Sequence, residues 1–183
     1  MSEEMQQGIS IMWFRRDIRL EDNMALYYAH KSGLPVLALF IFDDQIISHL
    51  DVNDARIDFI YQNLRKINLS IRKDRGDLCI HKGRVIDIFN HLSGRFNIQA
   101  IYANADHEQY GIKRDKEVKS WAEKRNISFV TFHDHMIHWP GTIVKSDEEP
   151  YTVFTPFSKK WKTVLSLDKL FDYTLNHESI NWV

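Results

Sequence analysis

The amino-acid sequence predicts an α/β protein with a doubly wound, five-stranded parallel sheet and helices on both faces, a Rossmann-like arrangement. Three observations support this fold class. Short apolar runs of β-forming residues recur along residues 1–133. Amphipathic stretches of about a dozen residues or more separate them, too long for hairpins and long enough for helical crossovers. Glycine or a helix-capping residue marks most boundaries.

The first strand is predicted at Ile9–Phe14, which is rich in β-formers. Asp22 or Asn23 can cap the helix that follows, and this helix ends near Gly33. Residues 36–42, VLALFIF, form a nearly continuous apolar run. Such a run is typical of a parallel strand that is buried on both faces.

The next elements follow the same alternation. Asn53 or Asp54 is predicted to open a long amphipathic helix that ends near Lys73. A third strand is predicted at Leu78–His81, and a helix over Val85–Leu92.

The last unit of the sheet consists of a strand at Ile98–Ala103, a charged helix at Glu108–Asn126 and a fifth strand at Ile127–Phe132. We therefore expect residues 1–133 to form one α/β domain. Residues 134–183 are expected to hold a loop, a short aromatic helix and the start of a linker to a further domain.

In that second part, Thr155 is a natural helix cap with Pro156 in the first helical position, and the helix is expected to run to about Leu165. The segment carries Phe154, Phe157 and Trp161, a heavy aromatic load. We expect these side chains to pack against a neighbouring domain rather than to stack on nucleic-acid bases.

Composition excludes several classes of function. The 183 residues contain 24 Lys and Arg against 25 Asp and Glu, a net charge of −1, whereas domains that grip nucleic-acid phosphates usually have a basic surplus. The polar, acidic N-terminus is not a secretory signal. The single cysteine, Cys79, lies in an apolar run and predicts a buried structural thiol in a reducing cytoplasm.

A cluster of charges marks the end of the first predicted strand. Residues 13–23 read WFRRDIRLEDN, and ligands of open α/β sheets usually bind at this carboxyl edge. Arginine binds anionic or carbonyl-rich ligands with a fork of donors. Arg15, Arg16 and Asp17 are therefore candidate ligand-binding residues. The alternative is an Arg–Asp cluster that ties the strand end to neighbouring loops or to a further domain.

The chain resembles the DNA photolyase and cryptochrome family. The resemblance rests on WFRRDIRLEDNMAL, FIFDD, Arg114-Asp115 and YTVFTPFSKKW in this order, and it covers the chain from Ile9 to about Leu165. It implies the front α/β domain of a deoxyribodipyrimidine photo-lyase, a carbon-carbon lyase that repairs pyrimidine dimers in DNA with light. This domain would bind an antenna chromophore, which passes excitation to FAD. FAD and damaged DNA would be bound by a larger helical domain outside this chain.

The resemblance also assigns candidate residues to the antenna site. Phe40, Ile41, Phe42 and Asp43 end the second strand, where a flat aromatic ligand could lie. Core packing and a cap of the next turn are the alternatives.

Asn104 and Glu108 lie in the loop after the fourth strand, which faces the antenna in this family. Capping of the next helix is the alternative for Glu108. Folate-binding members carry an Asn-Glu pair where this chain has Tyr110-Gly111. This departure favours a deazaflavin or a flavin over methenyltetrahydrofolate.

Other functions remain open at this stage. A cryptochrome-type blue-light receptor has the same front domain, and lesion type and oligomeric state are not readable. A stand-alone nucleotide-binding module would need a glycine-rich phosphate loop, which does not follow Ile9–Phe14. A scaffold with no chromophore is the third alternative. His133, His135 and His138 suggest zinc, but no cysteine is near them, and we expect no metal site.

Overall fold

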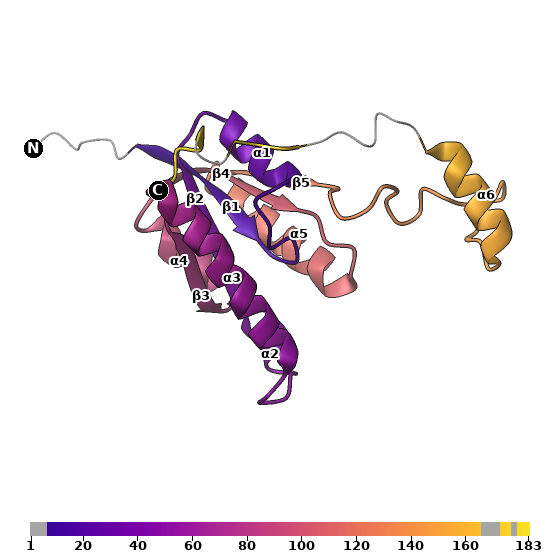
Figure 1. The fold of residues 1–183 in the computed structure, drawn as a ribbon, viewed down its shortest axis with the longest axis horizontal. Coiled ribbons are helices and arrows are strands. Elements are labelled where there is room, and N and C mark those ends of the chain that lie inside the picture. The colour runs from indigo at the N-terminus through magenta and orange to yellow at the C-terminus, as the bar shows by residue number, and fades with distance from the viewer. Residues whose placement is uncertain (1–6, 166–172, 177–178) are drawn as a thin grey trace, which may run out of the picture.

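The computed structural model describes residues 7–165, 173–176 and 179–183, and its centre is a parallel sheet in the order β3-β2-β1-β4-β5 (Figure 1). Neighbouring strands pair in parallel throughout, as in the register Met12↔Ala38 between β1 and β2. The strands are β1 (Gly8–Phe14), β2 (Val36–Asp43), β3 (Leu78–Gly83), β4 (Asn97–Asn104) and β5 (Ser128–Phe132).

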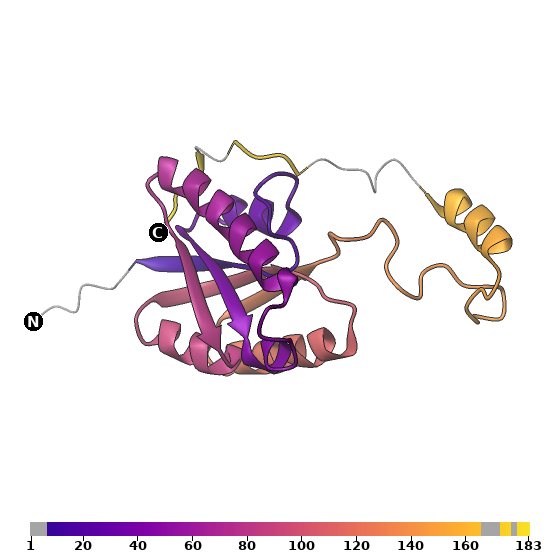
Figure 2. The ribbon, with the colours of Figure 1, turned by 60° about the horizontal axis from the view of Figure 1, so that its bottom comes forward.

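Helices cover both faces of the sheet. α1 (Met24–Lys31) and α3 (Ala55–Lys73) lie on one face, and α4 (Val85–Ser93) and α5 (Gln109–Glu123) lie on the other (Figure 2). Two hydrophobic clusters fill the layers between sheet and helices. Trp13 and Phe14 show how β1 supplies both, since consecutive strand residues point to opposite faces. The predicted doubly wound α/β fold is confirmed.

The five predicted strands are all present, and their bounds differ from the expected ones by one or two residues. β2 continues to Asp43 and β3 to Gly83, so both strands extend further toward the edge where the charged residues gather. Asn23 caps α1 by accepting a hydrogen bond from Leu26 N, and Asp54 caps α3 by accepting one from Arg56 N. Both belong to the residue pairs predicted as caps.

Two local features differ from expectation. A four-residue helix, α2 (Asp44–Ile47), follows β2 directly, and Asp43 caps it by accepting a hydrogen bond from Gln45 N. The predicted Thr155 cap is wrong, because α6 (Phe154–Val164) begins two residues earlier than expected, with Val153 at its N-cap. Pro156 thus takes the third helical position. It still fits there, since the first four helical N–H groups need no intrahelical acceptor.

The segment Ser179–Val183 returns to the sheet. Val36 N donates to Asn181 O at 2.7 Å, and Val183 N donates to Val36 O at 3.0 Å. Ile180 and Trp182 are 4% and 8% exposed and belong to the hydrophobic cluster under α1 and α3. The Trp182 side chain lies so close to Gly76 that a Cβ there would meet Trp182 Cβ at 2.3 Å.

The stretch between β5 and this segment leaves the body of the domain. Figure 1 shows a long connection from β5 to α6, and α6 lies apart from the sheet. Phe154 on α6 is 78% exposed. In the part of the chain that the structure describes, no helix has the length and apolar character needed to cross a membrane.

Cys79 is only half-buried, which corrects the expectation of a fully buried thiol. The reason is its place on β3, an edge strand of the sheet. Its Sγ lies 3.2 Å from His81 Nε2, and burial raises the pKa of the thiol, which keeps it protonated near neutral pH.

Candidate functional site

A cavity of about 530 Å³ lies at the carboxyl edge of the sheet, bounded by the ends of β1 and β2, by α2 and the start of α3, and by the β4–α5 connection. Its size is within the usual range for small-molecule sites, about 300–1,000 Å³. Its lining residues are Trp13, Arg15, Arg16, Ile18, Phe40, Ile41, Phe42, Asp43, Gln45, Ile46, Ile47, His49, Leu50, Arg56, Ile57, Phe59, Ile60, Val85, Asp106, Glu108, Tyr110, Gly111 and Arg114.

One side of the cavity is apolar. β2 contributes Phe40 and Phe42, whose rings are 5.0 Å apart and nearly perpendicular. α3 contributes Ile57 and Ile60 from the same helical face, one turn from each other. α2 adds Ile46 and its neighbours. These side chains form a wall that suits a flat, apolar ring system.

Two buried guanidinium groups flank the indole of Trp13. The Cζ atoms of Arg15 and Arg114 lie 4.9 and 5.0 Å from the Trp13 ring centroid. Asp115 pairs with both guanidinium groups. Its Oδ1 lies 2.5 Å from Arg15 Nη1 and 3.3 Å from Arg114 Nη2. Burial lowers the pKa of Arg15, while the Asp115 charge opposes this shift. The charges of this cluster are therefore paired with one another at the cavity.

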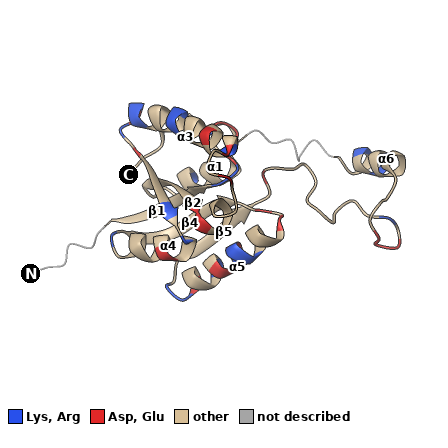
Figure 3. Ribbon diagram, turned by 90° about the horizontal axis from the view of Figure 1, so that it is seen from below, with Lys and Arg blue, Asp and Glu red and all other residues tan. Residues whose placement is uncertain are grey.

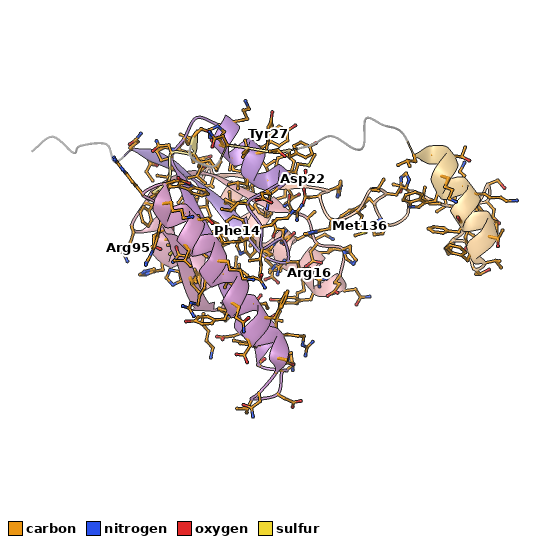
Figure 4. The ribbon with its side chains drawn as sticks, in the orientation of Figure 1. Phe14, Arg16, Asp22, Tyr27, Arg95 and Met136 are labelled. Atoms are coloured by element: carbon orange, nitrogen blue, oxygen red, sulfur yellow. The ribbon has the colours of Figure 1, made fainter. Side chains whose placement is uncertain are left out.

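Arg16 lies at the rim of the cavity. Its Nη2 is 2.5 Å from Glu108 Oε2 and its Nε is 3.6 Å from Asp106 Oδ2, while its side chain stays 48% exposed. The hydrogen bond between Arg16 and Glu108 raises the pKa of Arg16 and lowers that of Glu108. Figure 4 labels Arg16 beside α5, and Figure 3 shows the mixed charges of this edge. Arg16 is thus one accessible cation of the site, and Arg56, whose side chain is 71% exposed, is a second.

The N-terminus of α5 is built around Asp106 rather than Glu108. Asp106 Oδ1 accepts a hydrogen bond from Glu108 N at 3.1 Å, and the Asp106 carboxylate lies against Gly111. A Cβ at Gly111 would meet Asp106 Cγ at 2.3 Å. Burial opposes ionisation of Asp106, but this hydrogen bond and the charges of Arg16 and Arg114 lower its pKa overall.

Asp43 and Tyr110 meet across the cavity. Asp43 is 5% exposed, and its Oδ1 accepts from Gln45 N at 3.1 Å. Its Oδ2 accepts a short hydrogen bond from the Tyr110 hydroxyl. Burial raises the pKa of Tyr110, and the hydrogen bond to Asp43 and the charge of Asp43 raise it further. The contact joins the end of β2 to the first turn of α5.

A second polar cluster lies beside the cavity and is fully buried. Asn104 Nδ2 donates to Asp17 Oδ2 at 2.7 Å and to Asn23 Oδ1 at 2.9 Å, and its Oδ1 accepts from Ala25 N at 3.1 Å. Asp17 also accepts from Arg15 N at 2.8 Å. This network joins the ends of β1 and β4 to the start of α1.

Asp134 extends the network to the segment after β5. Its Oδ1 accepts from Met24 N at 3.1 Å, and its Oδ2 lies 2.5 Å from Arg19 Nη2. Three side chains from different parts of the chain therefore cap α1. Within the motif after β1, Asp17, Arg19 and Asn23 thus have this structural role.

Of the nine residues predicted to bind a cofactor, seven line the cavity: Arg15, Arg16, Phe40, Ile41, Phe42, Asp43 and Glu108. Asp17 and Asn104 lie outside the lining, 2% and 1% exposed in the buried network. For Asp17, the geometry therefore favours the alternative in which the residue ties the strand end to its neighbours.

Sequence reasoning missed Tyr110, Arg114 and the wall from α3 as parts of the site. A signal existed for Tyr110 and Arg114, because both lie in the first two turns of the helix that follows β4. The wall from α3 had none, because its apolar residues repeat like any core-facing helix.

The predicted histidine group lies in the connection after β5. His133 packs on Trp139 with ring centroids 3.8 Å apart, and His138 Nε2 lies 3.2 Å from Trp161 O. These contacts join the connection to itself and to α6.

Comparison with known proteins identifies relatives. A family model described as DNA photolyase matches residues 10–174. A deoxyribodipyrimidine photo-lyase from Alkalihalophilus pseudofirmus is 34% identical over 159 residues, which are 84% of this chain and 33% of that protein.

Solved structures agree with these matches. A bacterial class III photolyase from Agrobacterium tumefaciens superposes with a TM-score of 0.77 at 25% identity over 88% of this chain and 33% of its own. An archaeal photolyase from Sulfolobus tokodaii is described as holding two FAD molecules and implying a novel light-harvesting cofactor. It superposes with a TM-score of 0.69 at 25% identity, over 85% of this chain and 35% of its own. The chain thus spans about a third of the length of these relatives.

Proposed function

The chain belongs to the DNA photolyase family, and on that premise we propose that its α/β domain binds a light-harvesting antenna chromophore for a deoxyribodipyrimidine photo-lyase. The observation that carries the proposal is the cavity at the carboxyl edge of β1 and β2. It combines a large apolar wall with an accessible arginine.

The residues of the cavity fit such a chromophore. Phe40, Phe42 and Ile60 offer flat apolar contact to a conjugated ring. Arg16, at the rim, can bind an anionic substituent because a guanidinium pairs well with phosphate or carboxylate. The cavity volume of about 530 Å³ leaves room for a ring of flavin size.

When bound, such a chromophore would supply absorption of near-ultraviolet or blue light. The residues of this chain hold the ring and exclude water. Rigid holding is useful because energy transfer depends on the distance and orientation of the two chromophores. The Arg15–Asp115–Arg114 cluster under Trp13 supplies that rigidity, since its charges are paired and buried.

A flavin or deazaflavin is the proposed chromophore class, in preference to methenyltetrahydrofolate. Tyr110 and Gly111 stand where folate-binding relatives carry an Asn-Glu pair. The archaeal relative described as having two FAD molecules supports a flavin as a reasonable occupant.

The remaining chemistry is proposed for the part of the parent protein that this chain does not include. That part would hold the FAD that transfers an electron to the pyrimidine dimer, and it would contact damaged DNA. The near-neutral charge of this chain supports the division. The exposed Phe154 on α6 supports a packing surface for that second domain. The unpaired Cys79 supports a cytoplasmic protein.

The test is equilibrium binding of riboflavin 5′-phosphate, a deazaflavin and methenyltetrahydrofolate to the 183-residue chain, followed by fluorescence and absorbance. We expect saturable binding of the first two. Arg16→Gln should weaken this binding by about three- to tenfold through loss of one charged contact. Arg72→Gln is the matched control, because Arg72 is a 60% exposed arginine paired with Asp77 away from the cavity.

Three results bear on the alternatives. Saturable ATP binding without chromophore binding would replace the proposal with a nucleotide-binding module. Absence of binding to all four compounds would favour a scaffold. Equal losses in Arg16→Gln and Arg72→Gln would show that the chromophore does not sit at this rim.

A further inference from the structure

Two readily oxidised rings line the cavity. Among the described residues of its lining, Trp13 and Tyr110 are the side chains that give up an electron most easily. Trp13 is 1% exposed and packs edge-on against Phe89 with ring centroids 5.2 Å apart, so its indole is fixed in place. A chromophore in this cavity would therefore share it with a well-positioned electron donor.

Electron transfer from such a ring is a common way in which an excited flavin loses its energy. The indole gives one electron to the excited ring system and becomes a radical cation. The electron then returns to the indole, and the absorbed energy is lost as heat. An antenna works only if this transfer is slower than energy transfer to the second chromophore. The cavity therefore needs a feature that makes its own rings poor donors.

Guanidinium groups lie against both rings. The Cζ atoms of Arg15 and Arg114 are 4.9 and 5.0 Å from the Trp13 ring centroid. Arg114 Cζ also lies 5.7 Å from the Tyr110 ring centroid. Both arginine side chains are buried, at 6% and 7% exposure, where charge–charge repulsion is screened less than in water. Oxidation of either ring would place a new positive charge next to an existing one.

We propose that Arg114, together with Arg15, protects the excited state of the bound chromophore by making Trp13 harder to oxidise. This inference rests on the proposed antenna function. Arg114 has the same effect on Tyr110, because one guanidinium contacts both rings. The two arginines thus act through the aromatic side chains, in addition to their ion pairs with Asp115.

The carboxylates of the cluster weaken this effect without removing it. Asp115 is paired with both guanidinium groups, and Asp106 Oδ2 lies 3.6 Å from Arg114 Nη2. Asp106 is shared with Arg16, whose Nε is also 3.6 Å away. The guanidinium groups are the charges in direct contact with the rings, so we expect part of the full repulsion to remain.

The experiment measures the fluorescence lifetime of riboflavin 5′-phosphate bound to the 183-residue chain. Arg114→Met keeps an unbranched side chain and removes the charge. We expect electron transfer from the rings to accelerate by on the order of tenfold and the lifetime to shorten by at least about twofold. Arg114→Lys keeps the charge and should retain the wild-type lifetime. The lifetime reports on bound molecules alone, so a change in affinity does not alter it.

Removal of the donors distinguishes electron transfer from a loosened cavity. Trp13→Phe and Tyr110→Phe, combined with Arg114→Met, should restore the long lifetime, which a purely structural role of Arg114 would not allow. Arg125→Met is the matched control. Arg125 Cζ lies 4.6 Å from the Trp121 ring centroid, and both residues are outside the cavity lining. The lifetime in this variant should equal that of wild type.

The outcomes separate the two proposals. If wild type binds the flavin and Arg114→Met leaves its lifetime unchanged, Arg114 does not protect the excited state and the antenna proposal stands. A shortened lifetime that the phenylalanine substitutions fail to restore would also overturn the inference. If Arg114→Met does not fold, Arg15→Met removes the other cation and should shorten the lifetime in the same way. If wild type binds no flavin, the antenna proposal fails and this inference fails with it.

Discussion

Asn104→Ala tests whether the motif at the end of β1 serves folding or the chromophore. Asn104 is 1% exposed and connects Asp17, Asn23 and the N–H of Ala25. Alanine keeps the main chain of β4, so the Asn104 carbonyl that accepts from Arg15 Nη2 remains. The substitution therefore removes the network and leaves the base of the cavity.

The expected loss of stability follows from the groups left behind. The Ala25 N–H, at the start of α1, loses its acceptor, and a buried orphan donor costs about 1–3 kcal/mol. Asp17 loses a 2.7 Å hydrogen bond but keeps those from Arg15 N and Asn23 Nδ2. A hydrogen bond to a charged group contributes about 1.5–3 kcal/mol. Together the loss is about 2.5–6 kcal/mol.

A domain of this size melts about 2–4 °C lower for each kcal/mol, so Tm should fall by about 5–24 °C. Calorimetry or circular dichroism measures this shift. Asn97→Ala is the matched control, because Asn97 is an exposed asparagine at the other end of β4, and its Tm should change little. Chromophore affinity below both melting temperatures should change less than about threefold. Reduced affinity with an unchanged Tm would refute this reasoning and place Asn104 at the chromophore.

Three further substitutions or conditions have defined outcomes. Gly111→Ala should destabilise the chain by about 1–3 kcal/mol in urea unfolding. The reason is that the new Cβ would lie 2.3 Å from Asp106 Cγ, and this clash outweighs the better helix propensity of alanine. A stabilised variant would show that Asp106 moves freely. Trp182→Ala should cost about 3–5 kcal/mol in the same assay, and a neutral result would mean that the C-terminal segment is not part of the core. Tyr110 has a folded pKa above its unfolded value of about 10, so its contribution is complete below that pH and is lost as pH rises through the folded pKa. Wild type should therefore lose stability at alkaline pH more steeply than Tyr110→Phe, and parallel curves would contradict the contact.

The sheet and its helices could be predicted because their causes are local. A strand buried on both faces must be a nearly continuous apolar run, as in Val36–Asp43. A capping side chain such as Asp54 indicates the start of a helix from its local sequence alone. Parallel strands share one carboxyl edge, so Arg16 and Asp43 could be placed near each other without coordinates.

The division of roles at that edge could not be predicted. Asp17 and Arg16 are neighbours, yet one side chain turns into a buried network and the other to the cavity rim. The direction depends on Asn104 and Asp106, which come from a different strand end some 90 residues later. Only the assembled sheet brings these partners together.

The return of Ser179–Val183 to β2 has a consequence for how this chain can vary. Phe132 ends β5 and Ser179 begins the segment that returns to β2, so the two ends of the connection between them are held on the same body, which Asp134 and Tyr173 also contact. Doubling the length of such a loop costs only about 0.6 kcal/mol in closure entropy. Insertions, tags or a grafted peptide near α6 should therefore leave the α/β domain of this chain folded, whereas cutting the chain before Ile180 would remove part of the core. This loop is the natural point for engineering a reporter into the domain without disturbing the cavity.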